Sequence, residues 1–364
     1  MDEFNRITRR EFLGKSLQLG AGAALLPGLS RYDKILSPAQ DQKLGRICIG
    51  NEGARFDIKS KPSINGANVG LVYHDDVIPW YRTVAASTMD LNNINQRWVE
   101  TEGGYINAGY VQPVRNILNT PADTLPTYGN HPGVWVEITV PVADLIMEGA
   151  PGSYWAQHTI RPRAYYGQVF WAEKTGVDEN NQIRYLLTQR YGAASEFYWV
   201  PGSACKILTP DDISPISPEV EDKQVIVNLA RQTLSCMEAG REVFFCRVST
   251  GPLLSDGWQT PPGTHAIWRK LVSLHMSAGG DTGEAFDTPG IGWTTLFTTT
   301  GAAVHSAYWH NEFGFARSHG CVNCLPEDAK YVWRWTTPVV DCEPGDLTWK
   351  DWTRGFTPIN VVES

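Results

Sequence analysis

Short runs of strand-forming residues, broken every few positions by turn residues, constrain the fold of this 364-residue chain more than any other feature. In ANVGLVYHDDVIPWYRTV (67–84) and NQRWVETEGGYINAGYVQPV (95–114), Val, Ile, Tyr and Trp alternate with polar residues, and Gly103-Gly104 marks a turn. The chain holds 34 Gly, 14 Trp and 14 Tyr, as expected for β-rich modules with aromatic cores and tight turns. We therefore predict a mainly β protein.

The length of the chain predicts two or three domains. Residues 41–116 are predicted to form a small β-barrel, because RWVETEGGYINAGYVQPV (97–114) resembles the final strands of a bacterial SH3-like domain. Residues 129–210 show a similar pattern without a clean repeat period, with a predicted turn at 178–181. We interpret them as a second, divergent SH3-like domain.

A segment rich in Pro, Ser and acidic residues, TPDDISPISPEVEDK (209–223), indicates a linker. Beyond it, residues 220–345 are predicted to form a β-rich domain with one helix. Pro326 and the two acidic residues after it predict the start of that helix, and Pro338 predicts its end. Residues 346–364 are expected to form a C-terminal extension.

The N-terminal stretch ITRREFLGKSLQLGAGAALLPG (7–28) places Arg9 and Arg10 before a short run of small and apolar residues. Paired arginines before such a run are typical of a twin-arginine export signal. The run is shorter than the roughly 20 apolar residues that span a bilayer. We assign residues 1–40 to this signal and a linker. We expect an exported protein of the cell envelope, on the wall side of the cytoplasmic membrane, with no stable membrane span after export. The net charge of −8 argues against nucleic acid as a partner.

Near the end of the chain, RSHGCVNC (317–324) places a serine, a histidine and two cysteines around one glycine. These letters allow a metal site, part of a disulfide framework, or a nucleophile with its base. For a zinc site the spacing is poor, because His319 and Cys321 are one residue apart and no second pair has the i, i+4 spacing of a helix. We therefore expect no metal and no cofactor.

The seven cysteines are an odd number, so at least one thiol stays unpaired or pairs between chains. Cys236 and Cys246 are candidates for a disulfide between neighbouring strands. Cys324 either pairs with Cys342 or remains a buried thiol. If Cys321 is a free nucleophile, the other six cysteines are even in number.

A catalytic nucleophile with its base accounts for most residues of RSHGCVNC (317–324). A cysteine attacks as a thiolate, so a nearby histidine or helix N-terminus is expected to lower the pKa of Cys321. His305 and His319 are candidate bases, and a predicted helix starts about five residues later. Gly320 permits a tight turn that aims the amides of Gly320 and Cys321 at a developing oxyanion.

The array of His305, thirteen intervening residues and then SHGCVN (318–323) resembles the L,D-transpeptidase catalytic domain of the YkuD type. That family has an upstream histidine followed by S/T-H-G-C, a hydrophobic residue and R/N. VSTG (248–251) and TPPGTH (260–265) also match it, and the resemblance covers residues 222–342. Ser306 departs from the family's usual glycine, and its carbonyl or hydroxyl is placed to orient His305. His310 is an alternative base.

The resemblance implies roles for the motif residues. Cys321 is implied to be the nucleophile and His305 the proton donor and acceptor, while His319 supports the site. The amides of Gly320 and Cys321 are implied to bind the oxyanion. Four neighbours are expected to meet the substrate or to support the loop: Arg317, Ser318, Asn323 and Ser306.

The implied reaction is acyl transfer on peptidoglycan stem peptides. Cys321 attacks the carbonyl of the diamino third residue of a tetrapeptide and releases the terminal D-alanine. A side-chain amine of a neighbouring stem then resolves the thioester and forms a 3→3 cross-link. Carbapenems are expected to acylate such a cysteine.

Other functions remain open at this point. In an L,D-carboxypeptidase or cysteine peptidase, water would resolve the thioester. Cell-wall peptidases of the NlpC/P60 type place the cysteine before the histidines, whereas here His305 and His319 both precede Cys321. A non-catalytic peptidoglycan-binding protein is a third possibility, against which the intact His305, His319 and Cys321 argue.

Overall fold

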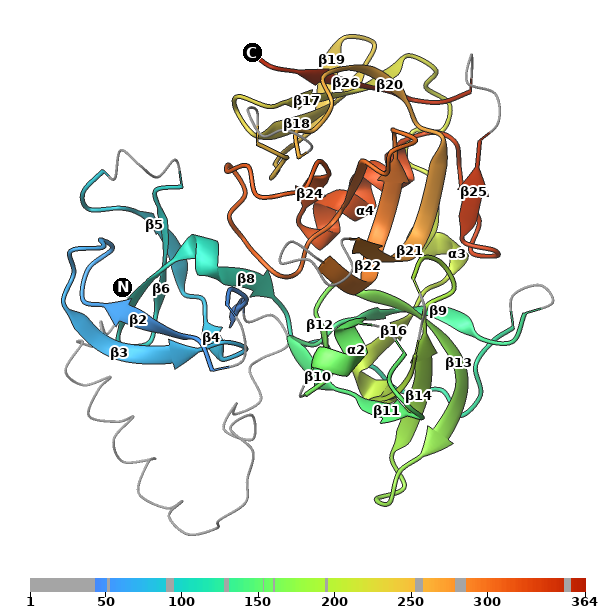
Figure 1. Cartoon of the computed structure of the whole chain (residues 1–364), viewed down its shortest axis with the longest axis horizontal. Helices are drawn as coiled ribbons and strands as arrows, with labels where there is room; N and C mark the ends of the chain where they lie inside the picture. Colours follow the sequence, from blue (N-terminus) through green and yellow to red (C-terminus); the bar gives the residue numbers. More distant parts are fainter. Residues whose placement is uncertain are drawn as a thin grey trace, which may run out of the picture. The chain divides into compact units, whose positions relative to one another are not determined.

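The computed structural model describes residues 43–50, 53–89, 95–127, 131–152, 154–159, 161–193, 196–252, 258–278, 286–349 and 355–364. Strands dominate the described residues (Figure 1), which confirms the predicted mainly β class. The predicted twin-arginine signal lies outside the described residues. Among the helices described, none has the length and apolar character needed to cross a membrane.

The N-terminal module, residues 43–115, consists of two small sheets with the strand orders β4-β1-β8 and β3-β2-β7-β6-β5. The strands are β1 (Leu44–Ile47), β2 (Arg55–Lys59), β3 (Asn68–Tyr73), β4 (Val77–Pro79), β5 (Arg82–Ala85), β6 (Arg97–Thr101), β7 (Gly104–Asn107) and β8 (Val111–Val114). Gly103, with a φ of +81°, makes the predicted turn between β6 and β7. Ile47, Val99 and Ile106 lie in one core shared by both sheets. The SH3-like identity of this module stays a prediction.

The middle module, residues 131–208, is a six-stranded antiparallel sheet in the order β11-β15-β14-β13-β9-β16. Its strands are β9 (Val134–Ile138), β11 (Ile146–Glu148), β13 (Val169–Val177), β14 (Ile183–Thr188), β15 (Phe197–Pro201) and β16 (Cys205–Ile207), and a second sheet pairs β10 (Val142–Asp144) with β12 (Arg163–Tyr165). A short helix, α2 (Tyr154–His158), lies between β11 and β12 in the sequence. Asp178 accepts hydrogen bonds from the backbone of Asn180 and Gln182, which forms the predicted turn.

The C-terminal domain contains two five-stranded sheets, in the orders β19-β18-β17-β26-β20 and β24-β23-β22-β21-β25. The first holds β17 (Lys223–Asn228), β18 (Thr233–Glu238), β19 (Arg241–Arg247), β20 (Gly263–Ala266) and β26 (Pro358–Val362). The second holds β21 (Arg269–Ala278), β22 (Phe286–Leu296), β23 (Ala303–Ser306), β24 (Val322–Cys324) and β25 (Asp346–Thr348). The predicted linker contains one helical turn, α3 (Pro210–Ile213).

The helix predicted after the cysteine motif is present as α4 (Pro326–Trp335), which packs on β22 and β23. It begins with Pro326 and two acidic residues, a favourable start for a helix. Its buried face includes Val332 and Trp333. The buried ammonium of Lys270 donates to the carbonyls of Thr336 at 2.7 Å and Pro338 at 2.8 Å, just beyond the end of α4. This lysine therefore satisfies backbone acceptors that have no partner within the helix.

Two expectations need correction. Residues 346–364 are not a separate extension, because β25 pairs with β21 and β26 lies between β17 and β20. Neither candidate disulfide is present, and all seven cysteines are free thiols. In the β18–β19 pair, the strand register places Cys246 opposite Leu234, whereas Cys236 lies opposite Phe244.

The middle module and the C-terminal domain share one hydrophobic core. Trp135 and Val169 of the middle module belong to the same buried cluster as Trp293 and Trp333 of the C-terminal domain. The backbone N–H of Ala193 also donates to the carbonyl of His275 at 3.0 Å. Side chains from two predicted domains are therefore packed as one unit.

Candidate active site

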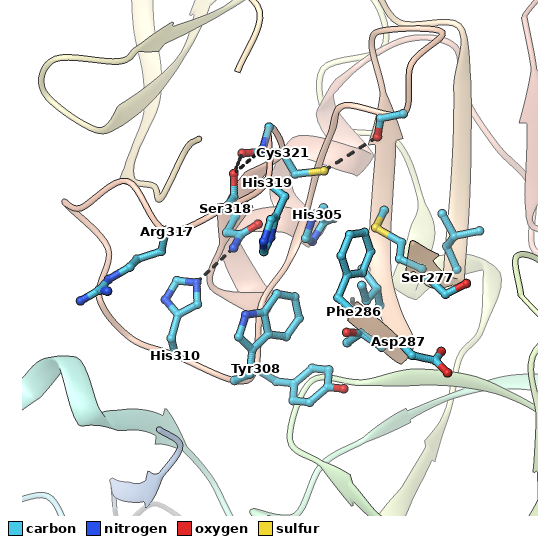
Figure 2. A pocket seen from close by; sticks show the side chains of 18 of the residues that line it. Ser277, Phe286, Asp287, His305, Tyr308, His310, Arg317, Ser318, His319 and Cys321 are labelled. Atoms are coloured by element: carbon cyan, nitrogen blue, oxygen red, sulfur yellow. Dashed lines mark hydrogen bonds between the residues drawn. The ribbon is translucent and has the colours of Figure 1, made fainter. Parts of the chain in front are cut away.

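A cavity of about 1370 Å³ contains the candidate catalytic residues (Figure 2). Its walls include Cys321, His305 and His319 of the C-terminal domain. They also include Arg46 of the N-terminal module and Tyr165 of the middle module. The volume exceeds that of a typical drug-sized ligand site, so the cavity has room for an extended ligand.

Cys321 and His305 come together because their strands are neighbours. The strands β23 and β24 pair in parallel, with Val304 opposite Val322 and His305 opposite Asn323. Cys321 immediately precedes β24, and the backbone N–H of Ala303 hydrogen-bonds to its sulfur. His305 lies two residues after Ala303 on the same strand, so the side chains of His305 and Ala303 face the same side of the sheet. The sheet thus brings the candidate nucleophile and the candidate base to one cavity wall.

His305, the candidate base, is held as a neutral imidazole. Its Nδ1–H donates to the carbonyl of Ser306 at 2.9 Å. Burial lowers the pKa of His305 to about 4. At neutral pH the imidazole is therefore uncharged, and its Nε2 carries the lone pair that can accept a proton.

Cys321 is held as a thiol. Its side chain is partly exposed to the cavity, yet burial of the sulfur raises its pKa to about 11. The Ala303 N–H acts in the opposite direction but is the smaller cause. The expectation of a lowered pKa is therefore wrong: desolvation outweighs the stabilisation available to the thiolate. Both groups are therefore neutral at rest, and the Cys321 thiol donates to the Gly301 carbonyl at 3.8 Å (Figure 2).

Ser318 organises the loop that carries Cys321. Its hydroxyl donates to the carbonyl of Cys321 and accepts from the Gly320 N–H at 3.2 Å. Its own N–H donates to the Thr250 carbonyl at 3.1 Å. Gly320 adopts a φ of +106°, which favours glycine. The Gly320 amide is thus engaged, whereas the Cys321 N–H has no hydrogen-bond partner among the residues that the structure describes.

His310 is occupied at both ring nitrogens. The N–H of Glu312 donates to Nδ1 at 3.2 Å, and the Asn323 side-chain amide lies 3.1 Å from Nε2. Burial is the main cause that lowers the pKa of His310 to about 3, and the nearby Arg317 adds to it. Asn323 is itself buried and exchanges backbone hydrogen bonds with Ser249. The hydrogen bond between the two side chains thus ties β24 to the segment that follows β23.

The other predicted residues differ in position. The exposed ring of His319 contacts Trp258 and Phe286, with ring centroids 3.6 Å and 5.6 Å apart. Arg317 lines the cavity and forms an ion pair with Glu312 at 2.7 Å. Ser306 does not enter the cavity, because its buried hydroxyl accepts from the Gly292 N–H.

Several cavity residues had no distinguishing signal in the sequence. Among them, Tyr308 and Phe286 line the cavity near His305 (Figure 2), and Trp309 is a further lining residue. His275 and Asp287 form a buried hydrogen-bonded pair in the same wall. Aromatic residues are common in the cores of β-rich modules, so their sequence pattern alone does not assign them to a cavity. Across the described part of the chain, no group of three or more His, Cys, Asp or Glu side chains is arranged to hold a metal ion.

Residues 222–360 match the family of L,D-transpeptidase catalytic domains, YkuD. This part of the chain is therefore an L,D-transpeptidase catalytic domain, which confirms the family predicted from the motif. The match extends past the predicted end at residue 345 and includes most of β26. No curated protein matches the chain.

Solved L,D-transpeptidase structures resemble parts of the chain. A mutant of the Enterococcus faecium L,D-transpeptidase is 21% identical with a TM-score of 0.30, over 40% of this chain and 51% of the other. The L,D-transpeptidase from Mycobacterium smegmatis is 16% identical with a TM-score of 0.31, over 66% of this chain and 99% of the other. The match thus spans about half the length of the Enterococcus faecium protein. At these TM-scores the likenesses carry no further argument.

Proposed function

We propose that this protein is a peptidoglycan L,D-transpeptidase that forms 3→3 cross-links through a thioester on Cys321. Enzymes of this family act on peptidoglycan. The observation that carries the proposal is the pairing of β23 with β24, which sets Cys321 and a neutral His305 in one cavity wall. The SH3-like modules, the twin-arginine export and the location in the cell envelope are parts of the same proposal.

In the first half of the reaction, the Cys321 sulfur attacks the carbonyl carbon of the diamino third residue of a tetrapeptide stem. The thiol proton moves to Nε2 of His305 as the carbon–sulfur bond forms. The developing oxyanion is stabilised by the Cys321 N–H, together with the Gly320 N–H once that group leaves Ser318. The imidazolium then gives its proton to the departing amine, and D-alanine leaves. The product is a thioester with neutral His305.

In the second half, the side-chain amine of a neighbouring stem attacks the thioester. His305 takes a proton from this amine and returns it to the leaving sulfur, which restores the thiol. The Ser306 carbonyl accepts from Nδ1–H of His305 throughout, so that Nε2 remains the nitrogen that exchanges protons with the reacting groups. The cavity, at about 1370 Å³, gives two stem peptides room to meet.

The remaining predicted residues take supporting roles. Ser318 and Asn323 position the loop and strand that carry Cys321, through the hydrogen bonds already described. His319 lies at the exposed edge of the site. Arg317 has a half-exposed guanidinium and meets a substrate carboxylate in this proposal.

Incubation of the purified protein with disaccharide-tetrapeptide, read by mass spectrometry, tests the proposal. We expect a cross-linked dimer that has lost one D-alanine, and a mass shift on Cys321 after carbapenem treatment. Cys321→Ala should abolish both results, whereas the matched control Cys324→Ala, a buried thiol three residues away, should keep both. Free tripeptide without dimer would instead identify an L,D-carboxypeptidase or cysteine peptidase. An unchanged substrate would leave a non-catalytic binding protein.

A further inference from the structure

We infer that the N-terminal module is a permanent part of the active site, and that its Arg46 is a positioning residue for the segment that joins His305 to Cys321. This goes beyond the proposed function, because wall-binding modules need not touch the catalytic centre. The segment concerned is 307–312, which follows the base and leads to the nucleophile loop.

Arg46 lies on β1, and only 1% of it is exposed. Its guanidinium donates to the Tyr308 carbonyl, three residues after His305. It also donates to Gln112 Oε1 at 2.8 Å and to Asp75 Oδ1 at 2.8 Å, and it lies over the ring of Tyr165 at 4.1 Å. A planar, fully engaged guanidinium fixes the directions of all its hydrogen bonds. The Tyr308 carbonyl is therefore held at a defined point.

Asn311 provides a second, independent clamp from the other side of the contact. Its side-chain amide donates to the carbonyls of Ala108 at 2.9 Å and Val111 at 2.8 Å. Its backbone N–H donates to the Gly109 carbonyl at 3.1 Å. These acceptors belong to the N-terminal module: Ala108 and Gly109 lie between β7 and β8, and Val111 begins β8. Both halves of the segment after His305 are thus hydrogen-bonded to another module.

Asp75 ties this contact to the middle module as well. Its buried carboxylate accepts from Arg46 at 2.8 Å, from Arg163 at 2.7 Å and from the Tyr165 hydroxyl at 3.1 Å. Arg46 belongs to the N-terminal module and Arg163 to the middle module, so one carboxylate joins two modules. Arg46 in turn links this pair to the C-terminal domain through the Tyr308 carbonyl. The N-terminal module also contributes His74 to the cavity wall. These contacts are buried and charged, and their loss would leave unpaired groups inside the protein.

Two variants test the inference in the full chain: Arg46→Met and the milder Asn311→Ala. We expect the carbapenem acylation rate at saturation to fall at least 10-fold in Arg46→Met and several-fold in Asn311→Ala. In both variants we also expect the acylation rate to begin its decline on acidification at a higher pH than the value of about 4 set by His305. The reason is that a loosened segment exposes the His305 imidazole to water, which raises its pKa. Arg190→Met is the matched control. Arg190 forms an ion pair with Glu343 at 2.7 Å and lies 4.3 Å from the Trp171 ring centroid, outside the cavity.

Amide hydrogen exchange in 307–312 provides a readout that does not require activity, and it should accelerate in Arg46→Met and Asn311→Ala but not in Arg190→Met. If the wild type is not acylated, the proposed function fails, and hydrogen exchange alone decides this inference. The inference is overturned if both variants keep the wild-type acid limb and exchange rates. It is equally overturned if Arg190→Met reproduces their changes, because the effect would then be general destabilisation.

Discussion

The reactivity of Cys321 towards iodoacetamide as a function of pH tests the neutral resting pair directly. With a pKa of about 11, only about 1 in 10⁴ of the thiol is ionised at pH 7. A free cysteine, with a pKa of about 8.5, is ionised to about 3 parts in 100. The thiolate fraction therefore differs by about 300-fold. A more basic thiolate is intrinsically more nucleophilic, with a Brønsted slope of about 0.4–0.5, which recovers about 10-fold. We expect Cys321 to be alkylated about 20- to 30-fold more slowly than free cysteine at pH 7.

The same values decide against a preformed thiolate–imidazolium pair. The pKa of His305 is about 4 and that of Cys321 about 11, so proton transfer between them costs about 9 kcal/mol before the two charges attract each other. Even for two charges only 4 Å apart at an effective dielectric constant of 20, the attraction returns only about 4 kcal/mol. The neutral pair remains favoured by about 5 kcal/mol. The rate of carbapenem acylation should accordingly be independent of pH from about pH 5 to 10. It should fall at lower pH, near the pKa of His305.

The alkylation assay is selective because the other six cysteines are buried. Mass spectrometry of the labelled peptide confirms the site, and Cys321→Ser should remain unlabelled in the native state. An alkylation rate at pH 7 that equals or exceeds that of free cysteine, with a limb between pH 6 and 8, would refute the reasoning. It would mean that an ion pair exists before substrate binds.

Three further predictions concern stability and the loop. His305 and His310 have folded pKa values of about 4 and about 3, below the ordinary 6.5, so the unfolded chain binds more protons. The free energy of unfolding keeps the full contribution of both histidines above about pH 6.5 and decreases as the pH falls. At pH 5 it should be lower by about 2 kcal/mol per histidine, which urea unfolding at pH 7 and at pH 5 measures. Lys270→Met should cost about 3 kcal/mol in the same assay, since it removes the ammonium that donates to three buried carbonyls near the end of α4, although the Trp333 carbonyl also accepts from the Thr336 hydroxyl; an unchanged midpoint would contradict this. Gly320→Ala should slow acylation strongly because φ is +106°, whereas Gly240→Ala, at a φ of +78° in an open turn, should cost stability without slowing acylation. Equal acylation rates in the two glycine variants would contradict the role of the Gly320 turn.

Local structure and the identity of the motif could be predicted because they depend on neighbouring residues. The turn at Gly103 needs a positive φ, and the start of α4 needs a proline with acidic neighbours, so each is encoded within a few positions. The order His305 followed by SHGCVN was likewise sufficient to predict the catalytic family.

The C-terminal boundary could not be predicted from local pattern. β26 is far in sequence from both strands that it joins, and its pairing with β17 and β20 is a long-range choice. For the same reason the register that separates Cys236 from Cys246 was not apparent from the sequence.

The sequence by itself determined the mainly β class, the motif and its family, because strand periodicity, turn residues and the spacing of His305 and Cys321 are properties of short segments. Only the tertiary structure decided the protonation state of the pair. Desolvation depends on every atom packed around a sulfur or an imidazole, and it raises the pKa of Cys321 where the motif alone predicted a decrease. The tertiary structure also brought Arg46 to the Tyr308 carbonyl, across 262 positions of the chain. Contacts between modules depend on the packing of complete surfaces, which no segment of the sequence contains.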